Sequence, residues 1–251
     1  MPPEPLGVNE IKIMREAGKV AAEVLQKIKA LLKPGIFTKD IELFFQESLE
    51  RYPGMDAAFK GFSGYPASCC VSVNEEVIHG IPAQRVIKDG DVVSVDLGIK
   101  YKGLFVDTAY TYIVGEPSQG AKKLVEVTLD SLNKGICQVK PGAKVGDIGF
   151  TVQQVAEQNG FSIIRKFVGH GVGRQLHLPP EIPNFGIRGG GMELESGYAI
   201  AIEPMVSAGG SEVDILEDGW TVKTRDNTKA AHFEHTVAIT DNGPVVLTEV
   251  A

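Results

Sequence analysis

An internal repeat is the sequence feature that most limits how this chain can fold. The segment 33–41 shares Lys-Pro-Gly and, four residues later, Asp-Ile with the segment 140–148. The same separation of 107 residues carries Asp96, at the end of Gly-Asp-Val-Val-Ser-Val-Asp, onto Glu203, at the end of Gly-Tyr-Ala-Ile-Ala-Ile-Glu. The alternative is a chance match of two short motifs. Because both motifs share one register, and because solenoid repeats are only about 20–50 residues long, the pattern favours two related halves.

We expect residues 1–251 to form a single catalytic domain, with halves of roughly 8–115 and 116–251 related by a pseudo-twofold axis. Asn9 and Thr38 are the expected N-caps of the first two helices. Asp241-Asn242-Gly243 predicts a hairpin turn between the last two strands. Apolar periodicity predicts helices over 9–33, 38–49, 119–137 and 145–158, and strands over 67–73, 91–99, 104–114, 161–168, 198–206, 222–223, 232–240 and 245–247.

Four carboxylates lie inside apolar segments that are predicted to be strands: Asp96, Asp107, Glu203 and Glu234. Burying a lone carboxylate costs several kcal/mol unless it is paired or bound to a metal. One acid could pair with an arginine, and acids at strand edges could face water. Four of them, together with His170 between two glycines, indicate instead a shared cation site with enough charge for two divalent ions.

The spacing of the acids predicts how they meet. Asp96 and Asp107 are 11 residues apart, which fits one hairpin whose strands each point a carboxylate at the same place. Glu203 precedes Pro204, which keeps the residue before it extended. Two cations about 3.5–4 Å apart can acidify water, and a nearby carboxylate can then act as general base. The chain has no Gly-x-Ser-x-Gly segment, so nothing indicates a nucleophilic serine.

The other histidines carry weaker signals. His79 precedes a glycine that allows close approach, and His177 follows His170 by seven residues. Either could be catalytic, although a lone histidine is as often structural. His232 and His235 flank Glu234; His232 would share its face of a strand and His235 would point away. We interpret both as mainly structural.

Composition excludes several classes of protein. The net charge of −7 and the absence of a basic stripe disfavour a sequence-specific nucleic-acid surface. No apolar run of about 18 residues predicts a membrane span, and the start lacks the features of a signal peptide. Three cysteines, two of them adjacent, make a poor disulfide framework. We therefore expect a cytoplasmic protein.

Eight short segments together resemble a known family. From about residue 11 to residue 247 the chain closely resembles the type I methionine aminopeptidases, which have the pita-bread metallopeptidase fold. The matching segments are Gly64-Tyr65-Pro66, Val73-Asn74-Glu75, His79-Gly80-Ile81-Pro82, Asp96 with Asp107-Thr108, Gly169-His170-Gly171-Val172-Gly173-Arg174, Ile202-Glu203-Pro204-Met205, Asp218-Gly219-Trp220-Thr221 and Phe233-Glu234-His235-Thr236.

The resemblance implies an α+β fold, with two pseudo-twofold halves around a central antiparallel sheet and helices outside. It implies removal of the initiator methionine from nascent proteins whose second residue is small, by water held between two ions of iron, manganese, cobalt or zinc. The implied metal ligands are Asp96, Asp107, His170, Glu203 and Glu234, with Asp107 and Glu234 bridging. Glu203 would also be the general base, and His79 and His177 would contact the substrate.

The implied pocket for the methionine side chain is lined by Phe59, Phe62, Tyr65, Cys70, Leu176 and Trp220. Phe59, Phe62, Leu176 and the segment Leu178-Pro179-Pro180 depart from the usual pattern of the family, and they affect the pocket and its rim. The family also implies a monomer that acts on nascent chains and associates transiently with ribosomes.

Two other functions remain open from the sequence. One is an Xaa-Pro peptidase of the same fold, which the short chain and Trp220 disfavour. The other is a non-catalytic ribosome-binding relative, which would be expected to lose metal ligands. All five ligand positions are filled in this chain.

Overall fold

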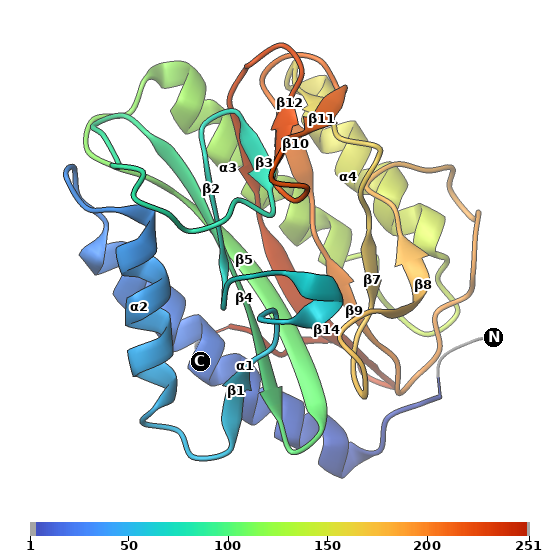
Figure 1. Ribbon diagram of the computed structural model, residues 1–251. Helices are drawn as coiled ribbons and strands as arrows, with labels where there is room; N and C mark the ends of the chain where they lie inside the picture. The colour runs from blue at the N-terminus through green and yellow to red at the C-terminus, as the bar shows by residue number, and fades with distance from the viewer. Residues whose placement is uncertain (1–3, 250–251) are drawn as a thin grey trace.

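The computed structural model describes residues 4–249, which fold around one large curved antiparallel sheet (Figure 1). The helices are α1 (Val8–Leu31), α2 (Thr38–Leu49), α3 (Gln119–Ile136) and α4 (Val145–Gln158), with a 3-10 turn at Phe62–Gly64. The strands are β1 (Met55–Ala57), β2 (Cys70–Val73), β3 (Glu76–Ile78), β4 (Val92–Tyr101), β5 (Leu104–Ile113), β6 (Ser162–Ile163), β7 (Gly169–Gly171), β8 (Leu178–Ile182), β9 (Ala199–Ile202), β10 (Met205–Ser207), β11 (Val213–Ile215), β12 (Val222–Thr224), β13 (Ala230–His232), β14 (Glu234–Thr240) and β15 (Gly243–Val246).

The order of the strands shows how the two ends of the chain meet. The large sheet runs β1-β4-β5-β14-β9-β7-β8, with β2 also pairing with β4 and β15 with β14. The hairpin β4–β5 pairs along its whole length, and the alternating residues Val93, Val95, Leu97 and Ile99 of β4 pack into the apolar cluster on the helix side. Strand β14, from near the C-terminus, lies between β5 and β9. The two parts of the sheet are therefore joined only through β14, which comes late in the chain.

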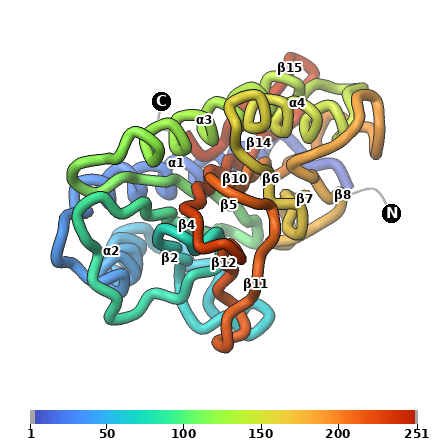
Figure 2. Tube along the Cα trace, turned by 90° about the horizontal axis from the view of Figure 1, so that it is seen from above, coloured from blue at the N-terminus to red at the C-terminus, as the bar shows by residue number. Residues whose placement is uncertain are grey.

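The helices cover one face of this sheet. Helix α1 packs on β4 and β5 and passes behind them in Figure 1. Helices α3 and α4 pack on each other along one side of the molecule, and β11 and β12 lie at the opposite side (Figure 2). Two large apolar clusters fill the space between helices and sheet, the first centred on Met14, Ile28 and Phe45. The second includes Leu124 and Ile148. The predicted α+β arrangement, with helices outside an antiparallel sheet, is confirmed.

The helix starts differ from the predicted caps. Helix α1 begins at Val8 rather than after Asn9, and the Glu10 carboxylate accepts a hydrogen bond from the Gly7 N–H at 2.8 Å. Thr38 is the first residue of α2 instead of its cap. The Asp40 carboxylate accepts a hydrogen bond from the Phe37 N–H at 2.8 Å, so this N–H group at the start of the helix has a partner. The N-cap residues are thus Gly7 and Phe37, and in both helices the acidic residue of the first turn binds the N–H of the N-cap residue.

Two long predicted strands are broken. The segment 198–206 forms β9 and β10 with Glu203 and Pro204 between them, and the segment 232–240 is interrupted at Phe233 between β13 and β14. Pro204 has no N–H to donate to a ladder, so β9 cannot continue through it. The segment 161–168 is wrong as a strand except for the two residues of β6. The predicted turn at Asp241 and Asn242 is confirmed, because Thr240 pairs with Gly243.

Several features recur at the spacing of 107 residues. Helices α2 and α4 begin at residues 38 and 145, and β4 and β9 begin at residues 92 and 199. Isolated bridges join Phe37 to Val86 and Lys144 to Glu193. Each bridge has the same spacing from its counterpart. These positions support the duplication of a single domain, which stays a prediction.

Candidate active site

A cavity of about 570 Å³ opens on the face of the sheet opposite α1. Every side chain named from the sequence as a site residue lines this cavity. The predicted set comprises Phe59, Phe62, Tyr65, Cys70, His79, Asp96, Asp107, His170, Leu176, His177, Glu203, Trp220 and Glu234. Leu178 and Pro179, expected at the rim, also line the cavity, and the lining residues that we did not predict are Ser63, Ile78, Phe167, Val168, Gly169 and Glu181.

The hairpin β4–β5 supplies the first two carboxylates. Asp107 lies directly across from Gly98, and Asp96 lies two residues from Gly98 on the same strand. Side chains two apart on a strand share a face, so both carboxylates point into the cavity. A Cβ at Gly98 would overlap the ring of Phe59, which covers this position. Glycine is thus required there for the aromatic wall to reach the carboxylates.

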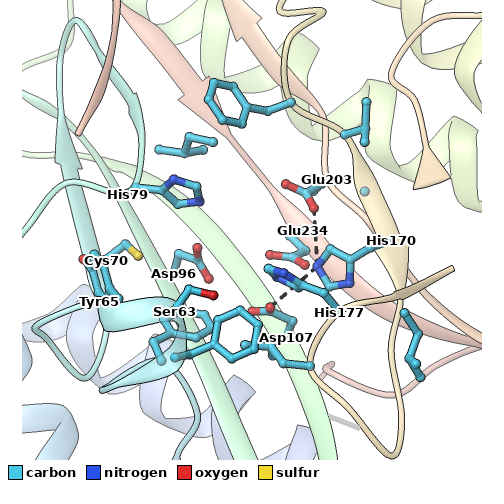
Figure 3. Close-up of a pocket in the computed structure, with 18 of the residues that line it drawn as sticks. Ser63, Tyr65, Cys70, His79, Asp96, Asp107, His170, His177, Glu203 and Glu234 are labelled. Atoms are coloured by element: carbon cyan, nitrogen blue, oxygen red, sulfur yellow. Dashed lines mark ion pairs between the residues drawn. The ribbon is translucent and has the colours of Figure 1, made fainter. Parts of the chain in front are cut away.

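The other half supplies three residues from three strands. His170 lies on β7, Glu203 directly follows β9, and Glu234 begins β14. The His170 Nε2 atom lies 3.7 Å from Glu203 Oε1 and 3.9 Å from Asp107 Oδ2 (Figure 3). Its Nδ1 lies 2.9 Å from the Gly171 carbonyl, which can only accept, so Nδ1 carries the proton. The Nε2 lone pair therefore points at the carboxylates.

Threonine hydroxyls hold the two carboxylate strands together. The Asp107 N–H donates to Thr236 Oγ1 at 2.9 Å, and the same hydroxyl donates to the Asp107 carbonyl at 2.8 Å. Thr108 Oγ1 donates to the Glu234 carbonyl at 2.8 Å. These bonds hold the backbone of Asp107 and Glu234 in place, and the two side chains line the cavity. Asn184 fixes the third carboxylate in the same way, through the Glu203 carbonyl at 2.9 Å.

Burial shifts the titration of every charged group at this centre. It raises the pKa of Asp96 to about 7, against hydrogen bonds from Asp107 and Cys70 that lower it. Burial, followed by repulsion from neighbouring carboxylates, raises the pKa values of Asp107, Glu203 and Glu234 well above their usual range. Burial lowers the pKa of His170 to about 3, so its ring is neutral near pH 7. Such a crowd of carboxylates favours a bound cation.

The polar atoms left without a partner lie at this centre. Within residues 4–249, the buried side-chain atoms that make no hydrogen bond are Asp96 Oδ1, Asp107 Oδ1, His232 Nε2 and Glu234 Oε1. Potential ligand atoms of Asp96, Asp107 and Glu234 lie within 4.8 Å of one another, as do those of His170, Glu203 and Glu234. Glu234 belongs to both groups. Oxygen-rich groups with one imidazole suit divalent cations, and two adjoining groups can hold two.

An apolar recess adjoins the carboxylates. Phe59, Tyr65, Cys70 and Leu176 are buried there and Trp220 packs against them. The Tyr65 hydroxyl donates to the Cys69 and Gly80 carbonyls at 3.2 and 3.1 Å, so its ring is fixed. The recess has the polarizable lining that an unbranched apolar side chain prefers.

Two histidines lie on opposite sides of the cavity. His79 has a left-handed backbone with φ of 59°, and its ring packs edge-on against Phe167 with centroids 5.9 Å apart. His177 lies at the exposed mouth, 4.2 Å from the His170 ring and 5.0 Å from the Phe62 ring, centroid to centroid. Burial lowers the pKa of His79 to about 4, and the same cause lowers the pKa of His177. Both rings are therefore neutral near pH 7.

His232, interpreted from the sequence as mainly structural, lies beside one of the carboxylates, and its structural role stays a prediction. Its Nε2 lies 3.7 Å from Glu203 Oε2 in the buried interior. From the sequence, we expected His232 to share a strand face with Glu234, because residues two apart on a strand point to the same side. His235 points away, as predicted, and its Nδ1 lies 2.9 Å from Thr248 Oγ1.

Comparisons with known proteins agree with this geometry. The model of Metallopeptidase family M24 matches residues 12–241. Methionine aminopeptidase 1 of Bacillus subtilis is 47% identical over 242 residues, which cover 96% of this chain and 97% of that protein. The crystal structure of a methionine aminopeptidase from Thermotoga maritima superposes with a TM-score of 0.96 at 46% identity, covering 98% of this chain and 99% of that one.

A more distant similarity concerns the fold alone. The prolidase from Pyrococcus furiosus has a TM-score of 0.79 at 21% identity, and the match covers 98% of this chain and 66% of the prolidase. The pita-bread architecture is thereby confirmed. Among residues 4–249, no helix combines the length and apolarity needed to cross a bilayer.

Proposed function

The chain belongs to metallopeptidase family M24 and is similar over nearly its whole length to methionine aminopeptidases, so we propose that it removes the N-terminal methionine from polypeptides. One observation carries this proposal: a cluster of buried carboxylates with a neutral imidazole adjoins a recess for an apolar side chain. The cluster accounts for hydrolysis and the recess for the choice of residue. Both line the same cavity.

The residues fit a pair of divalent ions. Unpartnered carboxylate oxygens of Asp96, Asp107 and Glu234, and the free Nε2 lone pair of His170, all belong to this cluster. Asp96, Asp107, His170, Glu203 and Glu234 would hold two ions, with Glu234 and Asp107 shared between them. Bound ions would supply Lewis acidity, which polarises a peptide carbonyl and acidifies water. Iron, manganese, cobalt and zinc all suit such ligands.

The protein's own groups would move the proton. Burial, followed by the charges of Asp107 and Asp96, raises the pKa of Glu203 well above its ordinary value, so its carboxylate is a stronger base than an exposed one. A Glu203 oxygen would accept the proton of the attacking water and return it to the leaving amine. His79 and His177, neutral near pH 7, would donate an N–H to the substrate carbonyl or backbone from the two sides of the cavity.

The recess would select methionine. Trp220, Tyr65 and Cys70 offer flat and polarizable surfaces to a thioether, and Phe59 and Leu176 close the remaining sides. Phe62 lies nearer the mouth, beside His177. A small second residue would be preferred because two ring pairs, Phe62 with His177 and Phe167 with His79, line the same cavity.

The setting of the reaction is also part of the proposal. The substrates would be nascent chains with a free N-terminus, met in the cytoplasm and during transient association with ribosomes. The enzyme would act as a monomer of 27.0 kDa, with no membrane or sequence-specific nucleic acid as partner. Gel filtration of the metal-loaded protein tests the oligomeric state, and elution at twice that mass would contradict it.

The test of the activity is release of free methionine from Met-Ala-Ser. Metal is stripped, then Mn²⁺, Fe²⁺, Co²⁺ or Zn²⁺ is added back singly, and the Asp107→Ala variant is assayed beside Asp56→Ala, whose carboxylate is exposed on β1. We expect metal-dependent release that only Asp107→Ala abolishes. Cleavage of Xaa-Pro peptides in place of Met-Ala-Ser would indicate the Xaa-Pro peptidase. No cleavage with any metal would favour a binding protein.

A further inference from the structure

One exposed carboxylate lies at the turn that carries Trp220. Strands β11 and β12 form a small hairpin, with Ile215 paired to Val222, and the residues 216–221 connect them. This hairpin lies at the edge of the molecule, away from α3 and α4 (Figure 2). Its strands are three residues each. The turn lies outside these strands, and hydrogen bonds hold it.

Asp218 provides those hydrogen bonds. Its Oδ1 accepts from the Trp220 N–H and the Thr221 N–H, both at 2.8 Å. Its Oδ2 accepts from the Thr221 hydroxyl at 2.6 Å. Although partial burial raises it, these bonds hold the pKa of Asp218 below its ordinary value. Two backbone bonds, Leu216 N–H to the Thr221 carbonyl and Gly219 N–H to the Leu216 carbonyl, complete the turn.

The turn fixes where the indole ring lies. Gly219 has a φ of +77°, a conformation that lets the chain reverse immediately before Trp220. The Trp220 ring then meets Tyr65 edge-on, with centroids 5.1 Å apart and an interplanar angle of 79°. Tyr65 is itself anchored through its hydroxyl. The position of this wall of the recess therefore depends on the backbone at residues 218–221.

The same hairpin also pairs with the strand that precedes His79. Val222 pairs with Ile78 on β3, and His79 directly follows Ile78. Thr221, which binds Asp218 through both its N–H and its hydroxyl, is buried. A shift of the turn would thus move the Trp220 ring first and reach His79 through one strand pair.

We propose that Asp218 is a positioning residue for substrate selection: by holding the turn, it keeps Trp220 against Tyr65 and so sets the width of the recess that receives the methionine side chain. The inference rests on the proposed function for its substrate. It assigns Asp218 no contact with the reacting atoms. Loss of the carboxylate would widen the recess, weaken binding of methionine and reduce discrimination against other apolar side chains, while the ligand cluster stays intact.

The single tryptophan of the chain makes this testable without activity, because all tryptophan emission comes from Trp220. The variants are Asp218→Ala, Asp218→Asn and, as a matched control, Glu217→Ala, whose neighbouring carboxylate is also exposed. In metal-free protein we expect Asp218→Ala to shift the emission to the red and raise its acrylamide quenching. Asp218→Asn, which keeps one oxygen as an acceptor for two N–H groups, should lie between it and the wild type. Glu217→Ala should match the wild type.

The kinetic readout distinguishes selection from chemistry. With Mn²⁺-loaded enzyme and Met-Ala-Ser, we expect Asp218→Ala to raise KM about tenfold with a smaller change in kcat, as for a lost set of charge-assisted hydrogen bonds. The preference for Met-Ala-Ser over Leu-Ala-Ser should fall by a similar factor, and Asp218→Asn should recover part of both. Bound metal per chain should equal that of the wild type.

Each result bears on the proposal. The proposal would be overturned if Asp218→Ala kept the emission and quenching of the wild type. It would also be overturned if kcat fell about tenfold while KM and selectivity stayed unchanged. If the wild-type protein released no methionine, the proposed function would fail on its own, whereas the emission of Asp218→Ala would still decide whether this carboxylate positions Trp220. If Asp218→Ala failed to fold by circular dichroism, a wild-type spectrum and selectivity in the folded Asp218→Asn would contradict the proposal.

Discussion

Replacing Asp96 by asparagine should stabilise the metal-free protein. Burial raises the pKa of Asp96 from 3.8 to about 7, so the folded protein resists ionising it. The difference of about 3 pKa units corresponds to about 4 kcal/mol of stability lost when the carboxylate is charged. Asparagine has the same shape and no charge. For a chain of this length, about 4 kcal/mol corresponds to a rise in Tm of roughly 8–16 °C at pH 8.

The pH dependence of this effect has a defined sign. The pKa of Asp96 is higher in the folded protein than in the unfolded chain. The free energy of unfolding of the wild type is therefore not reduced by this group below pH 3.8, and it falls as the pH rises from 3.8 to about 7. The lowered pKa values of the histidines act in the opposite direction, but equally in both proteins, so they cancel in the difference. The advantage of Asp96→Asn should therefore be near zero at pH 3.8, intermediate at pH 5 and complete above pH 7.

Thermal unfolding by circular dichroism, after dialysis against chelator, measures this difference at each pH. Mn²⁺ at 1,000 times Kd should remove this difference, because wild type gains about 4 kcal/mol from the bound metal and the variant lacks one ligand. Asp56→Asn, an exposed carboxylate on β1, serves as the control and should change Tm little. A metal-free Asp96→Asn no more stable than wild type at pH 8, or an advantage equal at pH 4 and pH 8, would refute the reasoning.

Three further substitutions probe the other parts of the molecule. His79→Ala should lower kcat by roughly 10²–10⁴ if its ring acts on the substrate, with bound metal measured by atomic absorption unchanged; metal loss would assign it a structural role instead. Gly98→Ala should displace the Phe59 ring, raise KM for Met-Ala-Ser and destabilise the protein by about 1–3 kcal/mol in urea unfolding. Phe45 lies on the buried face of α2, and Phe45→Ala should lower the free energy of unfolding by about 3–5 kcal/mol while the folded fraction keeps its kcat. A fall in kcat would show that this core supports the site.

The sequence allowed the site to be predicted better than the strands that carry it. Buried acids leave a strong signal because apolar neighbours are unusual for them, and Asp96 and Asp107 meet as the hairpin spacing predicts. Strand ends were less predictable. Glu203 and Phe233 lie where the chain leaves one strand for another, and an apolar run does not reveal such a break.

Short elements escaped prediction for a related reason. Strand β11 and strand β1 have three residues each, too few for alternation to be distinguished from chance. Their pairing is determined by partners far away in sequence, such as β4 for β1. The proposed role of Asp218 could not be predicted either, because the segment Asp218-Gly219-Trp220-Thr221 does not reveal which backbone atoms the carboxylate binds.

The position of β14 between β5 and β9 has a consequence for how a new molecule becomes competent. A chain emerging from synthesis up to residue 220 already contains Asp96, Asp107, His170 and Glu203, yet the two parts of its sheet have no strand to join them. The contacts that align the halves, such as Thr108 with Glu234, span 126 residues and form only when the final segment arrives. A product truncated at residue 220 would thus carry four of the five proposed ligands but lack Glu234 and the strand that joins the two parts of the sheet, so we expect it to bind no metal.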